Sequence, residues 1–136
     1  MVNLFPILFL ALLGHTILRV FLGLSLVYLG VTHFRKQKEP LVNALILGFP
    51  FLGRAARYVA FKYALVEVVI GLMFVVGILT QAAAIAGMIL SLKMLVFRKK
   101  FTYPLVPQPL FWMMVFGASS SLLITGAGAL AFDFPI

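Results

Sequence analysis

The stretch YVAFKYALVEVVIGLMFVVGILTQAAAIAGMILSLKMLVF, residues 58–97, decides the fold. It is 40 residues long and almost wholly apolar. A single helix of that length would extend about 60 Å, roughly twice the hydrocarbon thickness of a bilayer. The stretch must therefore fold back on itself. Gly77 is a suitable helix C-cap and Thr80 a suitable N-cap, so we place the turn at GILTQ.

The composition predicts a membrane protein. Of the 136 residues, 64% are hydrophobic and 10% are charged, whereas a soluble domain carries roughly 25% charged residues. A soluble domain of this size would expose too much surface for so few charges to cover. The absence of cysteine excludes disulfides and cysteine-bound metal clusters. The net charge of +8 lies in short segments between apolar runs, which is typical of membrane proteins and not of nucleic-acid binding.

We therefore predict an all-α membrane protein, a four-transmembrane-helix bundle in which residues 1–136 form a single domain. The expected spans are residues 16–34, 58–78, 80–97 and 110–131. Between the first two spans, LVNALILGFPFLG has too few apolar residues to cross a bilayer and contains Pro50. We expect a short interfacial or re-entrant helix there. The N-terminal MVNLFPILFLALLGH has no basic start, so we expect it to be retained and not cleaved as a signal peptide, with a bend at Pro6.

The basic residues predict the orientation in the membrane. The first loop contains Arg35, Lys36, Lys38, Arg54 and Arg57, and the third contains Arg98, Lys99 and Lys100. The first and third loops of a four-span chain lie on the same side. By the positive-inside rule that side is cytoplasmic and both termini lie outside the cell (inner) membrane.

Small residues recur at four-residue spacing in the third and fourth spans. The two stripes are Ala83, Gly87 and Ser91, and Gly117, Ser121 and Thr125. Such stripes allow helix backbones to approach closely in lipid. A ligand groove is the alternative interpretation, and we favour helix packing.

The apolar stretch contains one acid, Glu67, and we expect it to pair with Lys93. Each residue lies 13 positions from Thr80, so both lie about 20 Å from the turn on adjacent antiparallel helices. An unpaired charge at that depth costs about 2.5–3.5 kcal/mol on insertion scales. Tyr63, one turn from Glu67, is placed to donate a hydrogen bond to it.

The remaining polar residues of the first span give weaker expectations. Arg19 lies in the outer part, where its partner is Asp133 or Glu67, or where its side chain extends outward to water. His15 and His33 are 18 residues apart on one helix, about 27 Å, so they cannot hold one metal or haem together. We expect His33 to be an interfacial residue and expect no metal site.

Glu67 itself has two interpretations that the sequence leaves open. Ionisable residues inside a membrane are often functional, which favours a proton or quinone site. A structural ion pair that fixes helix register is the alternative.

Three segments resemble the DoxX family of membrane proteins. They are LRVFLGLSLVYLGVTHF, with an arginine before a glycine-punctuated helix, YALVEVVIGLMFVVGILTQAAAIAG, with a glutamate before a glycine and a turn, and the C-terminal SSSLLITGAGALAFDFPI. The resemblance implies a four-helix membrane bundle. It marks as family-motif positions Arg19, Glu67, Gly71, Gly126, Gly128 and Asp133. Lys93 departs from the family pattern, which usually has an apolar residue there.

The resemblance also implies a function. DoxX-like chains are membrane subunits of a thiosulfate:quinone oxidoreductase, other members belong to oxidative-stress complexes, and distant relatives act as chaperones or cargo receptors. We therefore expect a small non-catalytic or quinone-interacting subunit of a membrane complex, not a self-sufficient enzyme. The chain has no ligand set for a redox cofactor, so a bound quinone is the candidate and electrons come from a partner.

Two other functions stay open. One is a scaffold or chaperone-like accessory protein that docks other membrane subunits, and the last-ranked is a small transporter acting as a homo-oligomer. The expected partners are the lipid bilayer and other membrane subunits or further copies of the chain, with no nucleic acid.

Overall fold

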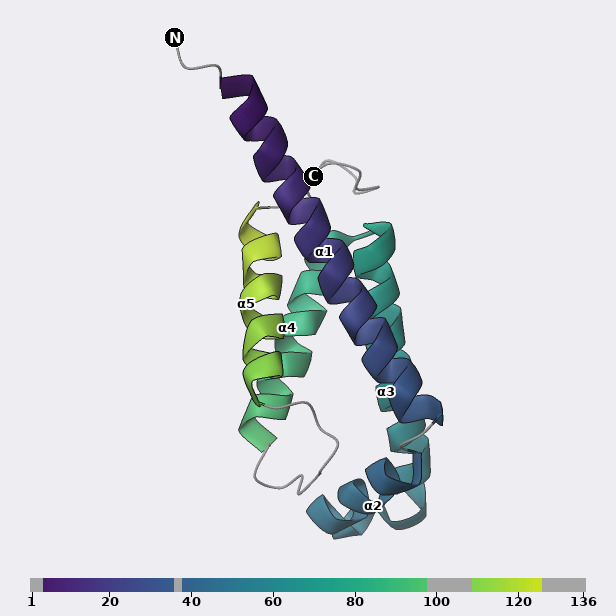
Figure 1. Ribbon diagram of the computed structural model, residues 1–136. Coiled ribbons are helices and arrows are strands. Elements are labelled where there is room, and N and C mark those ends of the chain that lie inside the picture. The colour runs from purple at the N-terminus through teal and green to yellow at the C-terminus, as the bar shows by residue number, and fades with distance from the viewer. Residues whose placement is uncertain (1–3, 36–37, 98–108, 126–136) are drawn as a thin grey trace.

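The computed structural model describes residues 4–35, 38–97 and 109–125. Every regular element in these ranges is helical (Figure 1). The elements are α1 (Leu4–Arg35), α2 (Lys38–Gly48), the 3-10 helix η1 (Pro50–Ala55), α3 (Ala56–Val76), α4 (Thr80–Phe97) and α5 (Pro109–Thr125). The predicted all-α class is therefore confirmed for the described chain.

Helix α1 is the longest element, with 32 residues, and its N-terminal part extends beyond the other helices in Figure 1. The expected bend at Pro6 is absent, because the helix runs without a break from Leu4. Pro6 lies in the first turn, where the backbone N–H that proline lacks has no partner within the helix. A proline further along the helix would have removed a backbone hydrogen bond and kinked or broken the helix.

Helices α1 and α3 are antiparallel and cross at close range through glycines. A methyl group on Gly71 would lie 2.7 Å from the Gly23 carbonyl oxygen and 2.7 Å from the Val27 nitrogen. A methyl group on Gly30 would lie 2.9 Å from the Ala64 carbonyl oxygen. These separations are shorter than any side chain tolerates, so the crossing requires glycine.

The predicted turn between α3 and α4 is present. Gly77 has φ 77°, the left-handed C-cap conformation, and its N–H donates to the Met73 carbonyl at 2.9 Å. Leu79 follows with φ 50° and accepts the hydrogen bond from the Ala83 N–H. Helix α4 begins at Thr80, so the capping residue is Leu79, one position before the expected Thr80.

Phe74 joins three helices at the centre of the core. Its side chain is fully buried, lies against α1 at Gly23 and covers Gly87 of α4. Gly87 also lies against the Ser119 hydroxyl of α5. The core around Phe74 includes Leu22, Leu26, Leu29, Ile70, Ala83, Ala84, Leu90, Met94, Trp112, Val115 and Leu122.

The two small-residue stripes have different positions. Ala83, Gly87 and Ser91 of α4 are all buried. In α5, Gly117 and Thr125 are exposed and Ser121 is half-buried, and no atom lies within 4 Å of where a Gly117 Cβ would be. In the described chain this second stripe therefore does not pack α5 onto the bundle. The inward face of α5 is formed instead by Trp112, Val115, Ser119 and Leu122.

The outer surface of the bundle is apolar. Large exposed side chains line the outer faces of the long helices, including Leu24, Leu72, Ile89, Leu92 and Met114. Ser25 and Thr32 donate their hydroxyls to backbone carbonyls one turn earlier, so these polar groups remain paired in apolar surroundings. Two described segments, Leu10–Arg35 and Pro50–Val76, are long and apolar enough to cross a membrane.

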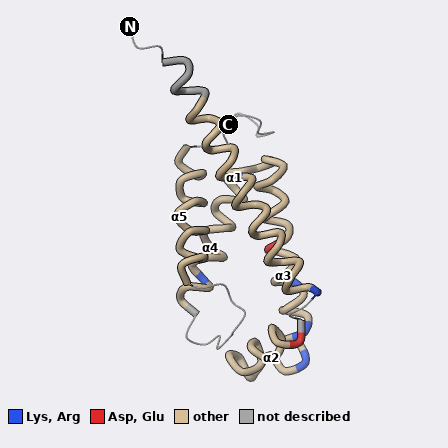
Figure 2. Tube along the Cα trace, viewed as in Figure 1, with Lys and Arg blue, Asp and Glu red and all other residues tan. Residues whose placement is uncertain are grey.

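The short segment between α1 and α3 lies across one end of the bundle (Figure 1). Helix α2 packs on the start of α3 through a second apolar cluster of Leu41, Val42, Leu45, Ala56 and Ala60. The Cα tube in Figure 2 is blue, marking Lys and Arg, at several positions around this end. We refer to it as the basic end, defined by Arg35, Lys38, Arg54 and Arg57.

The α1–α3 crossing gives a stability prediction. Replacing Gly71 by alanine forces a methyl group against the α1 backbone, which we expect to cost about 1–3 kcal/mol as overpacking. The measurement is unfolding of the purified protein in detergent, followed by circular dichroism.

Gly117→Ala is the matched control, since it is also a helical glycine but faces open space. It should not lower stability, because alanine is the better helix former. Equal unfolding midpoints for Gly71→Ala and wild type would contradict a glycine-dependent crossing.

Candidate functional site

A buried histidine–glutamate pair joins α1 to α3. The Glu67 side chain is 0% exposed and that of His33 is 1% exposed, with His33 Nδ1 2.6 Å from Glu67 Oε2. The predicted Glu67–Lys93 pair is wrong: Lys93 is exposed on α4 and forms no ion pair with any described residue. The expectation that His33 is interfacial is also wrong, because its side chain is in the protein interior.

The helix geometry explains why these two residues meet. Side chains on a helix lean toward its N-terminus, so on antiparallel helices His33 and Glu67 lean toward each other. They converge near the level where Gly30 lies against the Ala64 backbone. Two small residues leave room there for an imidazole and a carboxylate.

Tyr63 connects the buried pair to the outside of the bundle. It lies one turn before Glu67 on α3, and its hydroxyl is within electrostatic reach of the carboxylate. That buried hydroxyl does not meet hydrogen-bond geometry with any described residue. The Tyr63 ring is 6.2 Å from the His33 ring, and the Lys93 ammonium lies 5.9 Å from its centroid. Tyr63 therefore stands between the buried pair and an exposed cation.

A groove between α3 and α4 ends at this tyrosine. It has a volume of about 410 Å³ and a mostly apolar lining, with two lysines at its edge. The lining includes Lys62, Tyr63, Val66, Ile70, Ile89 and Lys93. The groove therefore has an apolar surface with one phenol and two ammonium groups in its lining.

Three buried polar atoms of the pair and its neighbour do not meet hydrogen-bond geometry with any described residue, although Tyr63 and Glu67 are close enough to interact. They are Glu67 Oε1, His33 Nε2 and the Tyr63 hydroxyl oxygen. Buried polar atoms normally make hydrogen bonds, and exceptions indicate water, an ion or a function. Because all three belong to one cluster, the cluster has the capacity to bind a polar group or water.

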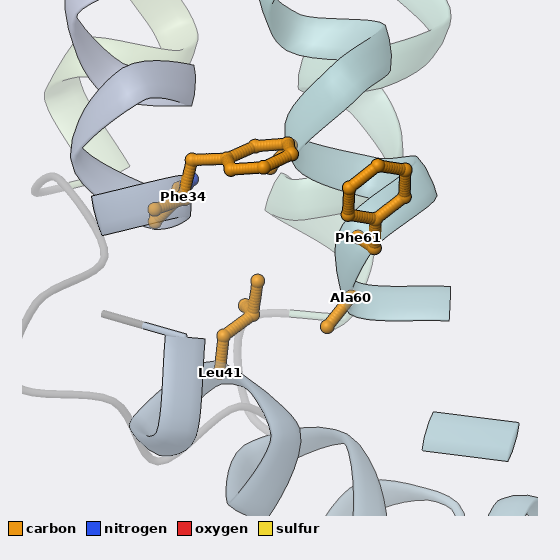
Figure 3. Close-up of a pocket in the computed structure, with 6 residues that line it drawn as sticks. Phe34, Leu41, Ala60 and Phe61 are labelled. Carbon is orange, nitrogen blue, oxygen red and sulfur yellow. The ribbon is translucent and has the colours of Figure 1, made fainter. Parts of the chain in front are cut away.

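A second, much smaller cavity lies on the opposite side of His33. It measures about 20 Å³ and is lined by His33, Phe34, Leu41, Ala60, Phe61 and Ala64. Figure 3 shows the Phe34 and Phe61 rings close together, with Leu41 and Ala60 below them. This cavity lies where α1, α2 and α3 meet, at the basic end.

Arg19 is separate from this cluster. Its side chain is 2% exposed and covers the α3–α4 turn: a methyl group on Gly77 would lie 2.6 Å from an Arg19 terminal nitrogen. The alternative in which Arg19 reaches Glu67 is therefore wrong. Its other expected partner, Asp133, lies outside the described residues, as do Gly126 and Gly128.

Two other predicted residues, Gly71 and Gly87, lie at contacts between helices. Gly71 is at the α1–α3 crossing and Gly87 is at the contact with α5. The described residues contain no group of three or more histidine, cysteine, aspartate or glutamate side chains placed to bind a metal.

Sequence reasoning missed His33, although a signal was present. Gly23 and Gly30 in α1 have the same seven-residue spacing as Ala64 and Gly71 in α3. Matching the two pairs in antiparallel register brings the end of α1 beside the middle of α3. That register places His33, and not Lys93, next to Glu67.

Comparison with known proteins agrees with this architecture. The profile of the DoxX family matches residues 14–99, a range that includes His33, Tyr63, Glu67 and Lys93. No curated protein gives a significant match, and no solved structure does so.

The apolar exterior, the long apolar helices and the buried charges define an α-helical membrane protein. The match extends over more than half of the chain, and the chain belongs to the DoxX family. The family resemblance seen in the sequence is thereby confirmed.

The ion pair gives a second stability prediction. Replacing His33 by leucine leaves a buried carboxylate without its partner, and breaking such a pair costs about 3–5 kcal/mol. Adding Glu67→Leu should recover a large part of this loss, because the unpaired charge is removed. Unfolding of the single and double variants in detergent measures the coupling.

Lys93→Leu is the contrasting variant. It should change stability by less than about 1 kcal/mol, since exposed charges contribute little. A loss as large as that of His33→Leu would indicate that Lys93 is the partner of Glu67 after all.

Proposed function

We propose that this protein is a small subunit of a membrane complex that binds a quinone from the lipid phase, in the groove between α3 and α4. The observation that carries the proposal is that Tyr63 lines this groove and neighbours the buried Glu67–His33 pair. The subunit supplies binding and polar contacts, and a partner subunit supplies electrons.

The groove suits a quinone in size and chemistry. Its volume of about 410 Å³ lies within the usual range of about 300–1,000 Å³ for small-molecule sites. A quinone carbonyl accepts hydrogen bonds, and the Tyr63 hydroxyl and Lys93 ammonium are donors. The apolar lining, including Val66, Ile70 and Ile89, is compatible with an isoprenoid tail that also contacts lipid.

The family supports a redox-linked role. DoxX-like chains occur as membrane subunits of a thiosulfate:quinone oxidoreductase, in which the quinone is reduced by electrons from the partner. In this chain Glu67 matches the family's glutamate, and it lies one turn from Tyr63, which lines the groove. A buried acid behind a quinone site has a chemical use, because quinone reduction consumes protons.

A scaffold or accessory role is the second candidate. The observation in its favour is the outer face of α5, where Gly117 and Thr125 are exposed in the described chain. Small residues at four-residue spacing permit close helix contact with another membrane protein. In this case the buried pair fixes the α1–α3 register and no quinone is bound.

Quinone binding by the purified full chain in lipid nanodiscs tests the proposal. Tyr63→Phe and Lys93→Gln should each weaken binding of a short-chain quinone analogue, measured by calorimetric titration, by about tenfold, equivalent to one lost hydrogen bond to a charged or buried group. Glu67→Gln should also weaken binding.

Arg54→Gln is the matched control, because Arg54 is an exposed basic residue of η1 outside the groove. It should leave binding unchanged. Equal affinity of wild type and Glu67→Gln, together with unaltered activity of the complex, would exclude the quinone function and favour the scaffold.

The same proposal includes a four-span topology in the cell (inner) membrane. Helices α1 and α3 are long enough to cross, and α4 and α5, with 18 and 17 described residues, are about 25–27 Å long, close to the hydrocarbon thickness. The basic end then faces the cytoplasm by the positive-inside rule. The α3–α4 turn and both termini face outward.

Single introduced cysteines test this topology, since the chain has none of its own. Ile78→Cys in the α3–α4 turn should react with a membrane-impermeant maleimide added to intact spheroplasts. Arg54→Cys at the basic end should react only in inverted vesicles. Labelling of both positions from one side would contradict the proposed orientation.

A further inference from the structure

The small cavity beside His33 lies where α1, α2 and α3 meet, at the basic end. Its volume of about 20 Å³ is enough for one water molecule, which needs about 10–15 Å³. The two rings that cover it are partly open to the surroundings: Phe34 is 40% exposed and Phe61 is 46% exposed. They contact each other edge to face, with centroids 4.8 Å apart. The cavity is therefore shallow and closed by two rings from different helices.

His33 lines this cavity, and its two ring nitrogens have different surroundings. Nδ1 is occupied by Glu67, while the buried Nε2 has no hydrogen-bond partner among the described residues. His33 is also in the last turn of α1, two residues before the helix ends at Arg35. His33 therefore contacts the carboxylate through Nδ1 and is itself part of the cavity lining.

We propose that water reaches His33 through this cavity and that the His33–Glu67 pair takes up and releases protons at the basic end of the bundle. The imidazole transfers a proton between its two sides: Nε2 accepts one from water in the cavity as Nδ1 gives one to the Glu67 carboxylate. Phe34 and Phe61 limit how often water enters.

The groups around the pair differ on its two sides. Helices α1 and α2 face the cavity with Phe34 and Leu41, which are apolar, and no charged side chain is in the cavity lining. On the other side, α3 contributes Tyr63, and the Lys93 ammonium of α4 lies beyond its ring.

The use of these protons rests on the proposed function. A quinone that receives two electrons from the partner subunit takes up two protons to become a quinol. For each proton, the Tyr63 hydroxyl gives its proton to the reduced quinone oxygen and receives one from the Glu67 carboxyl group. His33 then gives its Nδ1 proton to Glu67 and takes one at Nε2 from hydronium in the cavity, which becomes water. The imidazole returns to its Nδ1–H tautomer before the second proton passes.

Nitrogen-15 NMR of histidine-labelled full chain in nanodiscs without quinone tests the proton exchange alone. The chain has two histidines, so His15→Gln assigns the signals. We expect the His33 ring N–H to exchange its proton with water. A His33 ring proton that does not exchange with water overturns the inference, and the quinone proposal then stands or fails on its own binding test.

Three variants decide the route of exchange. Phe34→Ala removes one covering ring and should accelerate exchange of the His33 ring proton at least tenfold. Phe21→Ala, which removes an exposed ring from α1 outside the cavity, should leave the rate unchanged. Ile89→Ala widens the groove side and should also leave it unchanged. If Ile89→Ala accelerates exchange and Phe34→Ala does not, protons enter through the groove and the inference is wrong.

Discussion

Two helices can cross as closely as α1 and α3 do only where neither has a side chain at the point of contact. Gly23, Gly30 and Gly71 provide that condition, and a methyl group at any of them would lie within 3 Å of the facing helix. The rest of the described structure depends on this crossing. It sets the antiparallel register, which brings the last turn of α1 beside the middle of α3 and so puts His33 against Glu67.

Placing a charged pair inside an apolar bundle is not a stabilising device by default. Removing two ionisable groups from water costs about as much as their attraction returns, and an apolar pair of similar volume is often as stable. The surroundings of Glu67 and His33 are consistent with a site, because Glu67 Oε1, His33 Nε2 and the Tyr63 hydroxyl are buried without partners in the described chain. A purely structural pair would be expected to have these remaining atoms satisfied.

The sequence predicted the helical class and the α3–α4 turn well and predicted the partner of Glu67 wrongly, for a physical reason. Helix length and turn position follow from apolar length and from Gly77, which are local features. Which face of a helix points into the bundle does not follow from local features. Because α4 and α5 are apolar on nearly all sides, their sequences do not distinguish the buried face from the exposed one. The distance of Lys93 from the turn correctly indicated its level in the bundle, where it lies near Tyr63. The distance did not indicate on which face of α4 the residue lies, and that face is exposed. The small-residue pattern in α5 shows the same ambiguity of facing. Gly117 is exposed, whereas Ser119, two residues later, is the small residue that meets Gly87.

The arrangement of polar groups along the bundle connects its two environments. On the groove side, Lys93 and Tyr63 border a space that opens toward lipid; on the other, His33 borders a water-sized space next to the basic end. Glu67 lies between Tyr63 and His33 and contacts neither lipid nor water directly. A carboxylate in that position can reach either side only through its neighbours, and the glycine crossing determines which side chains those neighbours are.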